Sequence, residues 1–193
     1  GMDNIDVEYA RSKGLKVFNT PAASSDSVAE LVMAHMRSLV RFMHDSNRQM
    51  PLDGDTQFAA LKKAYANGIE LKGRTLGIIG FGRIGQALAK LAIGAGMRVI
   101  FSDMHNDDVE VSLDFFDGQS ATFTCKNVGF EGVLAESDFI SLHVPGGDLI
   151  GAAELAKMKD GVFLLNAARG GVINEEALLD ALESGKVAGA GLD

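Results

Sequence analysis

Short apolar segments alternate with amphipathic segments of helical period from Thr75 to Asp193. The apolar segments predict strands at 75–79, 97–102, 139–142, 162–165 and 187–192, and the amphipathic ones predict helices at 83–95, 130–135, 152–158 and 175–183. Strands that alternate with helices in this way imply right-handed crossovers and a parallel sheet covered by helices on both faces. We therefore expect an α/β protein with a doubly wound parallel sheet.

The first part of the chain has a different pattern. A helix is predicted over 4–13, ending at Gly14, and a short strand over 16–20. One helix and one strand cannot form a domain, so we interpret residues 1–22 as the remnant of a second domain and residues 23–193 as the main domain. A long helix is predicted over 27–44, a loop over 51–55 and a shorter helix over 57–67.

The predicted helix over 27–44 carries more apolar residues than one stripe requires. Ser27 and Glu30 match the S-x-x-E capping box that marks a helix start. Two explanations of the excess remain open, namely burial between two layers of this chain or a homodimer interface.

Period-two alternation replaces the helical period between residues 109 and 127, on either side of Asp117 and Gly118. This pattern predicts a β-hairpin inserted into the α/β scheme, most simply as an elaboration of the sheet edge.

A glycine-rich turn follows the first strand of the regular region, with glycines at Gly80, Gly82 and Gly85. After it, Gly85, Ala89 and Ala92 form a stripe of small residues that allows the helix to pack closely on the strand. A G-x-G-x-x-G sequence between a strand and a helix is typical of the pyrophosphate-binding turn of dinucleotide-binding domains. The context favours a Rossmann-type fold over a strand-to-helix turn without a ligand.

An acidic residue, Asp103, ends the second strand of the same unit. A carboxylate at this point accepts hydrogen bonds from a ribose diol and repels a 2′-phosphate. The expected cofactor is therefore NAD, in preference to its 2′-phosphorylated form.

Two further strand ends carry polar candidates. Arg169 lies among small residues, and its planar fork suits the carboxylate of a 2-oxo or 2-hydroxy acid, although a surface ion pair with Glu175 or Asp193 fits the spacing equally well. His143 could line the adenosine side of the cleft or be a packed histidine without a role in binding.

Composition and charge exclude several classes of function. The net charge is −8 and 47% of the residues are hydrophobic, without a basic cluster, so we expect a soluble globular protein that binds no nucleic acid. No apolar run is long enough for a membrane span, and the single Cys125 suggests a reduced thiol in a cytoplasmic protein. The histidines lack partners at metal-ligand spacing, so no metal site is predicted.

Taken in order along the chain, seven short motifs resemble the D-isomer-specific 2-hydroxyacid dehydrogenase family, in particular its phosphoglycerate dehydrogenase branch of serine biosynthesis. The matching stretches are 1–6, 19–21, 27–30, 77–85, 137–145, 166–171 and 188–193. The resemblance implies an NAD-binding domain inserted into a substrate domain. It also implies a homodimer and hydride transfer between nicotinamide and a small 2-hydroxy or 2-oxo acid.

The resemblance also implies roles for individual residues. The expected cofactor-binding residues are Gly80, Gly82, Arg83, Ile84, Gly85, Asp103, His143, Val144, Pro145, Ala167, Ala168, Arg169 and Asp193. Among these, Arg83 and Ile84 would offer backbone amides to the pyrophosphate, and Arg169 would be the catalytic residue that orients the substrate carboxylate.

Two departures from the family pattern accompany the resemblance. The His and Glu that the family uses for acid/base chemistry have no match in these residues, so the chain as given is expected to be catalytically incomplete. The loop after Pro145 is a few residues shorter than in similar family members. The missing acid/base pair and the apolar excess of the predicted helix over 27–44 leave a second hypothesis, a non-catalytic, NAD(H)-sensing dimeric interaction module.

Overall fold

A computed structural model describes residues 2, 4–20, 22–104 and 107–193. Seven strands form one sheet in the order β3-β4-β2-β1-β5-β6-β7. Their bounds are β1 Thr75–Ile79, β2 Arg98–Ser102, β3 Val109–Asp114, β4 Ser120–Asn127, β5 Phe139–Leu142, β6 Val162–Asn166 and β7 Val187–Leu192. All neighbouring strands are parallel except β3 and β4, which are antiparallel. The prediction of a doubly wound α/β fold is confirmed.

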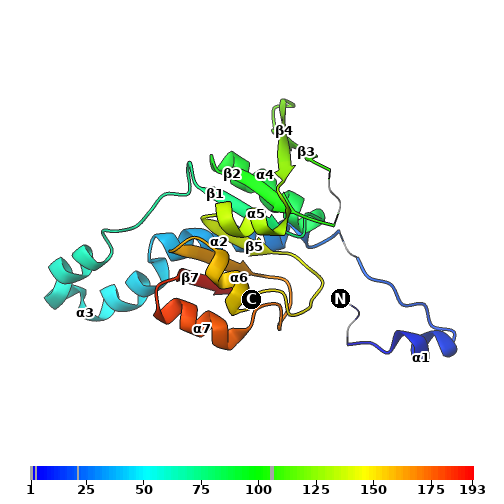
Figure 1. The fold of residues 1–193 in the computed structure, drawn as a ribbon, viewed down its shortest axis with the longest axis horizontal. Coiled ribbons are helices and arrows are strands. Elements are labelled where there is room, and N and C mark those ends of the chain that lie inside the picture. The colour runs from blue at the N-terminus through cyan, green and yellow to red at the C-terminus, as the bar shows by residue number, and fades with distance from the viewer. Residues whose placement is uncertain (1, 3, 21, 105–106) are drawn as a thin grey trace.

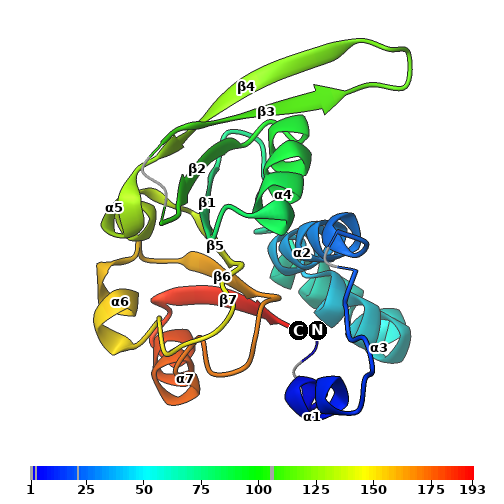
Figure 2. The same cartoon turned by 90° about the vertical axis from the view of Figure 1, so that its right-hand side faces the viewer.

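Helices cover both faces of the sheet (Figures 1 and 2). The helices are α1 Val7–Ser12, α2 Ser25–Val40, α3 Met43–Ala64, α4 Arg83–Gly94, α5 Gly129–Glu136, α6 Ala152–Lys157 and α7 Glu175–Glu183. One core cluster joins α2 and α4 to the sheet, and a second joins α5, α6 and α7 to the opposite face. The central strands β1 and β5 are buried along their whole length, which explains their continuous apolar sequence.

The small-residue stripe of α4 is buried as predicted, at Gly85, Ala89 and Ala92. A Cβ atom added at Gly85 would lie 2.5 Å from the carbonyl oxygen of Gly80, so the glycine is required for the helix to approach the turn this closely. The close packing of α4 on β1 therefore follows directly from the sequence.

The predicted hairpin is present, and its two strands pair from Val109 with Cys125 to Asp114 with Ser120. β4 also pairs with β2 in parallel through Lys126 and Asn127. The hairpin is therefore more than an edge elaboration, because β4 provides the next strand of the main sheet.

Four predictions for the first part of the chain are wrong, namely the bounds of the long helix, its capping box, the loop after it and the strand at 16–20. The long helix runs from Ser25 to Val40 instead of 27–44, so Ser27 lies inside it, and its N-cap, Ser24, makes no side-chain capping bond. It ends because Phe42 has a left-handed φ of 52°, which breaks the helix before α3. The predicted loop at 51–55 is helical, because Pro51 lies inside α3, whose kink is at Gln57.

The segment at 16–20 forms no strand in the structure. Its Phe18 is almost fully exposed. A strand needs a neighbour for its hydrogen bonds, and no described segment pairs with this one.

Candidate functional site

The glycine turn packs directly against the end of β5. Gly80 has a φ of 91°, and a Cβ atom there would lie 2.6 Å from the carbonyl oxygen of His143. The Gly80 N–H donates to the carbonyl oxygen of Ser102 at 2.9 Å. Phe81, which is buried, stacks on Phe101 with ring centroids 3.9 Å apart. The turn is thus held by both neighbouring strands, and only glycine fits at its first position.

The start of α4 offers space for an anion. Gly82 is the N-cap residue of α4 and has extended backbone, and a Cβ atom there would meet no heavy atom within 4 Å. The first turn, which begins with Arg83 and Ile84, contains no acidic residue. Backbone N–H groups at a helix N-terminus favour phosphate groups. The residues present therefore fit a pyrophosphate that approaches the backbone at Gly82.

The carboxylate of Asp103 lies beside this turn. Its Oδ2 atom accepts a hydrogen bond of 2.6 Å from the Phe81 N–H. The bond fixes the carboxylate at the carboxyl end of β2, next to the expected pyrophosphate site, where a ribose diol would bind. The sequence indicated the diol role, whereas the hydrogen bond to the turn has no local sequence signal.

His143 follows β5, and its imidazole is turned into the protein. The Nε2 atom lies 2.9 Å from Ser141 Oγ, while Nδ1 is buried without a hydrogen-bond partner among the described residues. Burial lowers the pKa of His143 from 6.5 to about 4. The ring is therefore neutral at pH 7, and the group nearest the glycine turn is the His143 backbone carbonyl.

We expect a measurable pH dependence of stability from His143. Between pH 6.5 and about 4 the unfolded state binds a proton that the folded state does not, so stability falls as the pH drops through this interval. The free energy of unfolding should fall by about 2 kcal/mol between pH 7 and pH 5 from this group. Urea denaturation of the wild type and of His143→Gln at both pH values measures it. An equal decrease in both proteins would contradict the assignment.

The loop after β6 is organised by Asn166, which is buried. Its Oδ1 accepts from the Ala168 N–H at 3.0 Å, and its Nδ2 donates to the carbonyl oxygen of Arg169 at 2.9 Å. The Asn166 carbonyl oxygen accepts from the Asp193 N–H at 3.0 Å. One side chain thus shapes the loop that presents Ala167, Ala168 and Arg169. The sequence motif contained Asn166, but sequence reasoning gave it no role.

Arg169 is exposed at the tip of this loop, and its Nη1 donates to the Ala168 carbonyl oxygen at 2.8 Å. Val144 is half-buried against the core and Pro145 is exposed. Two glycines with positive φ follow Pro145.

The predicted site residues all follow the carboxyl ends of parallel strands, at one edge of the sheet. In space β1 lies between β2 and β5, and the chain leaves β1 toward β2 before it returns to β5 on the other side. Ligands of open α/β sheets bind at such a switch point. The contact of Gly80 with His143 lies there, so the geometry fits a dinucleotide that extends from Asp103 across the glycine turn toward Arg169.

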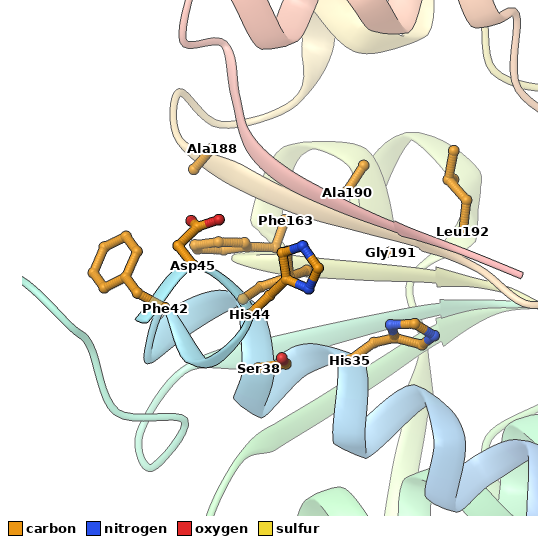
Figure 3. Close-up of a pocket in the computed structure, with 11 residues that line it drawn as sticks. His35, Ser38, Phe42, His44, Asp45, Phe163, Ala188, Ala190, Gly191 and Leu192 are labelled. Carbon is orange, nitrogen blue, oxygen red and sulfur yellow. The ribbon is translucent and has the colours of Figure 1, made fainter. Parts of the chain in front are cut away.

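A cavity of about 520 Å³ lies elsewhere, between α2, the start of α3 and β7 (Figure 3). Its polar side chains are His35, Ser38, His44 and Asp45. None of the residues predicted to bind the cofactor lines it. The glycine turn, the Asp103 carboxylate and the loop after β6 that carries Arg169 (the arginine loop) all lie at the carboxyl ends of the strands, whereas the residues that line the cavity include no comparable set.

Neither a metal group nor a membrane span emerges from the described part of the chain. No three His, Cys, Asp or Glu side chains gather there as potential metal ligands. None of the helices described is long and apolar enough to cross a bilayer.

Fold and site together define a dinucleotide-binding domain of the Rossmann type. Residues 33–193 match the family model described as "D-isomer specific 2-hydroxyacid dehydrogenase, NAD binding domain". The chain belongs to this family, and it carries the family's NAD-binding domain.

Individual relatives agree with this assignment. The chain is 44% identical to hydroxypyruvate reductase of Thermotoga maritima, over 100% of this chain and 58% of the relative. It is 38% identical to D-3-phosphoglycerate dehydrogenase 1 of Saccharomyces cerevisiae, over 100% of this chain and 38% of the relative. A solved structure of D-2-hydroxyisocaproate dehydrogenase matches with a TM-score of 0.82 and 34% identity, over 100% of this chain and 55% of that one. The chain thus spans between about a third and three fifths of these relatives.

Proposed function

We propose that this chain forms the coenzyme-binding half of an NAD-dependent dehydrogenase that interconverts a small 2-hydroxy acid and its 2-oxo acid. The observation that carries the proposal is the glycine turn, packed on the His143 carbonyl and hydrogen-bonded to the Asp103 carboxylate. When bound, the nicotinamide coenzyme accepts or donates the hydride. We further propose that the complete protein acts in the cytoplasm, in keeping with the buried free thiol of Cys125.

The proposed roles divide the dinucleotide along the sheet edge. The backbone amides of Arg83 and Ile84 bind the pyrophosphate, and Asp103 binds the adenosine ribose. Val144 and Pro145 border the adenine, with His143 behind them. Ala167, Ala168 and Arg169 lie on the nicotinamide side, and Asp193 binds the carboxamide. The open space over Gly82 and the hydrogen bonds of Asn166 support this division.

Within residues 1–193 we assign one catalytic residue, Arg169. Its guanidinium pairs with the substrate carboxylate through two parallel hydrogen bonds and so fixes the reacting carbon relative to the nicotinamide. We propose that the acid/base pair comes from outside these residues, from the substrate domain to which residues 1–22 also belong.

For the substrate we propose a three-carbon 2-oxo acid, with 3-phosphohydroxypyruvate as the phosphoglycerate dehydrogenase form of the reaction and hydroxypyruvate as the alternative. The sequence motifs support the first, and the 44% identity to a hydroxypyruvate reductase supports the second. Comparing kcat/KM of the full-length protein for the two acids with NADH decides between them. We expect the kcat/KM of the preferred acid to exceed that of the other acid by more than about 100-fold. A site that pairs the substrate phosphate with cationic side chains leaves these side chains unpaired when the substrate has no phosphate. Turnover of neither acid would contradict the proposal.

The coenzyme preference should depend on the charge of Asp103. Calorimetry is expected to show at least tenfold tighter binding of NADH than of NADPH. Asp103→Asn keeps an oxygen that can accept from the Phe81 N–H but removes the negative charge. It should therefore bring the NADH and NADPH affinities closer together, with little loss of stability. Asp103→Ala removes both and should also weaken NADH binding. Preferential binding of NADPH by the wild type would refute the role of Asp103.

We also propose a homodimer through the outer surface of α2 and the neighbouring part of α4. Most of the apolar excess of α2 is explained within the chain, because Val32, Met33, Met36 and Val40 are buried. Leu31 remains more than a third exposed, as does Leu91 on α4. These two leucines and the family resemblance support the dimer.

A further inference from the structure

The hairpin formed by β3 and β4 extends well beyond the body of the molecule (Figures 1 and 2). At its base, Val111 and Cys125 are buried in the core. Phe123 lies directly opposite Val111 on the same face, and the turn beyond them carries Phe115 and Phe116. Phe116 is fully exposed and the other two are about half exposed. An apolar strip thus runs out of the core and ends in uncovered aromatic rings, which is typical of an interaction surface.

Most charges around this strip are negative, and the one lysine of β4, Lys126, pairs with Asp108 at 2.6 Å at the base of the hairpin, away from the turn. Between Asp107 and Cys125 the sequence contains five acidic residues and no lysine or arginine. They are Asp107, Asp108, Glu110, Asp114 and Asp117. Acidic residues along an exposed edge strand oppose pairing with an identical edge. The aromatic turn therefore fits a surface that is apolar in its centre and basic at its rim.

The same chain has such a surface. A groove of about 430 Å³ lies at the ends of α2 and α4. Val40, Ile69 and Leu71 form its apolar part. Arg37, Arg41 and Lys72 supply positive charge around them, against Glu70 as the one acidic side chain among the lining residues. The groove thus complements the hairpin turn in both polarity and charge.

Both features lie at the amino-terminal end of the sheet. β4 runs parallel to β2 and joins it through Lys126 and Asn127, so the turn at its other end extends past the start of β2. The groove borders the segment before β1, where Ile69 N–H donates to the Val40 carbonyl oxygen. The coenzyme edge is at the opposite end of the strands. Contact between turn and groove would therefore leave the coenzyme site open.

We propose that the hairpin is a clasp between two copies of this chain, in which Phe115 and Phe116 of each copy occupy the groove of the other. The proposal rests on the proposed dimer. The hairpin projects on the side of the sheet that carries α2 and α4 (Figure 2), where the second copy would lie. Four phenylalanines bury about 600 to 1,000 Å², less than the roughly 1,200 to 2,000 Å² of a stable interface. The clasp therefore adds to the contact between the α2 surfaces and cannot replace it.

Sedimentation of the full-length protein over a range of concentrations tests the clasp. The double variant Phe115→Ser/Phe116→Ser should raise the dimer dissociation constant at least tenfold. Thr122→Ala/Thr124→Ala, on the polar face of the same hairpin, should leave it within twofold. A dimeric wild type with an unchanged constant in the phenylalanine variant overturns the clasp alone. A monomeric wild type overturns both the dimer and the clasp.

Charge reversal identifies the contact surface. Asp114→Arg and Arg37→Glu/Arg41→Glu should each weaken the dimer at least tenfold, because each places like charges together. The combined variant should recover at least half of the loss on a logarithmic scale. Additive weakening would show that turn and groove do not meet, and would overturn the proposal.

Discussion

Gly80→Ala is expected to destabilise the protein and to abolish NADH binding. A side chain at a φ of 91° costs about 1–2 kcal/mol. Its Cβ atom would lie 2.6 Å from the His143 carbonyl oxygen, which forces β1 and β5 apart for a similar further cost. The free energy of unfolding should therefore fall by about 3 kcal/mol, which urea denaturation without coenzyme measures.

Substitutions at two other glycines separate the cost of the backbone conformation from the effect of the added methyl group. Gly73 has a φ of 79° with no neighbour within 4 Å of an added Cβ atom, so Gly73→Ala should lose only the conformational part and keep NADH binding. Gly82 lacks positive φ and also has open space. Gly82→Ala should therefore fold normally but bind NADH at least 100-fold more weakly, because the new methyl group fills the space assigned to the pyrophosphate. Normal NADH binding by Gly82→Ala would show that the pyrophosphate lies elsewhere.

The turn was predictable because its requirements are local. The turn is encoded in one contiguous stretch, in which a strand, three spaced glycines and a helix with small residues follow one another. Each of these parts can be recognised from its own residues. The contact partner of Gly80 was not predictable in the same way. His143 lies far along the chain, and its ring, the conspicuous part of the residue in the sequence, is turned away to Ser141. The backbone carbonyl that makes the contact has no residue-specific signal.

The errors in the first part of the chain have a related cause. Pro51 and Gly54 are loop signals, yet both lie inside α3, where proline costs a backbone hydrogen bond but does not prevent the helix. The end of α2 depends on the left-handed backbone of Phe42. This conformation is uncommon for residues other than glycine, so a phenylalanine in the sequence does not predict it. Residues 16–20 have a composition that favours a strand. A strand also needs a neighbouring strand to pair with, and residue propensities do not tell whether one is present.

The arginine loop illustrates what the structure adds to a motif. From spacing alone, Arg169 could equally have been a surface residue. Asn166 holds the loop through its own side chain, which accepts from Ala168 N–H and donates to the Arg169 carbonyl oxygen. A loop shaped by a buried amide keeps the arginine at the strand end where the nicotinamide side of the site is expected, and this arrangement favours the binding role.

If the proposed function holds, Arg169→Lys in the full-length protein should reduce kcat roughly 30- to 1,000-fold. Lysine keeps the charge but replaces a planar, two-pronged donor by a single ammonium group, so one charge-assisted hydrogen bond to the substrate carboxylate is lost together with the orientation it enforces. A loss of about 2–4 kcal/mol of transition-state stabilisation corresponds to this range. Steady-state kinetics with the preferred 2-oxo acid and NADH measure the change.

Two further measurements make the assignment specific to the substrate. NADH affinity of Arg169→Lys should stay within about threefold of wild type, because we assign the main coenzyme contacts to the glycine turn and Asp103. Arg83→Lys is the matched control, since Arg83 is assigned a role through its backbone amide, which the substitution retains. Its kcat should change less than threefold. Near-normal kcat in Arg169→Lys would remove Arg169 from the active site, and an equal loss in both variants would show that the loss is not specific to a contact between Arg169 and the substrate.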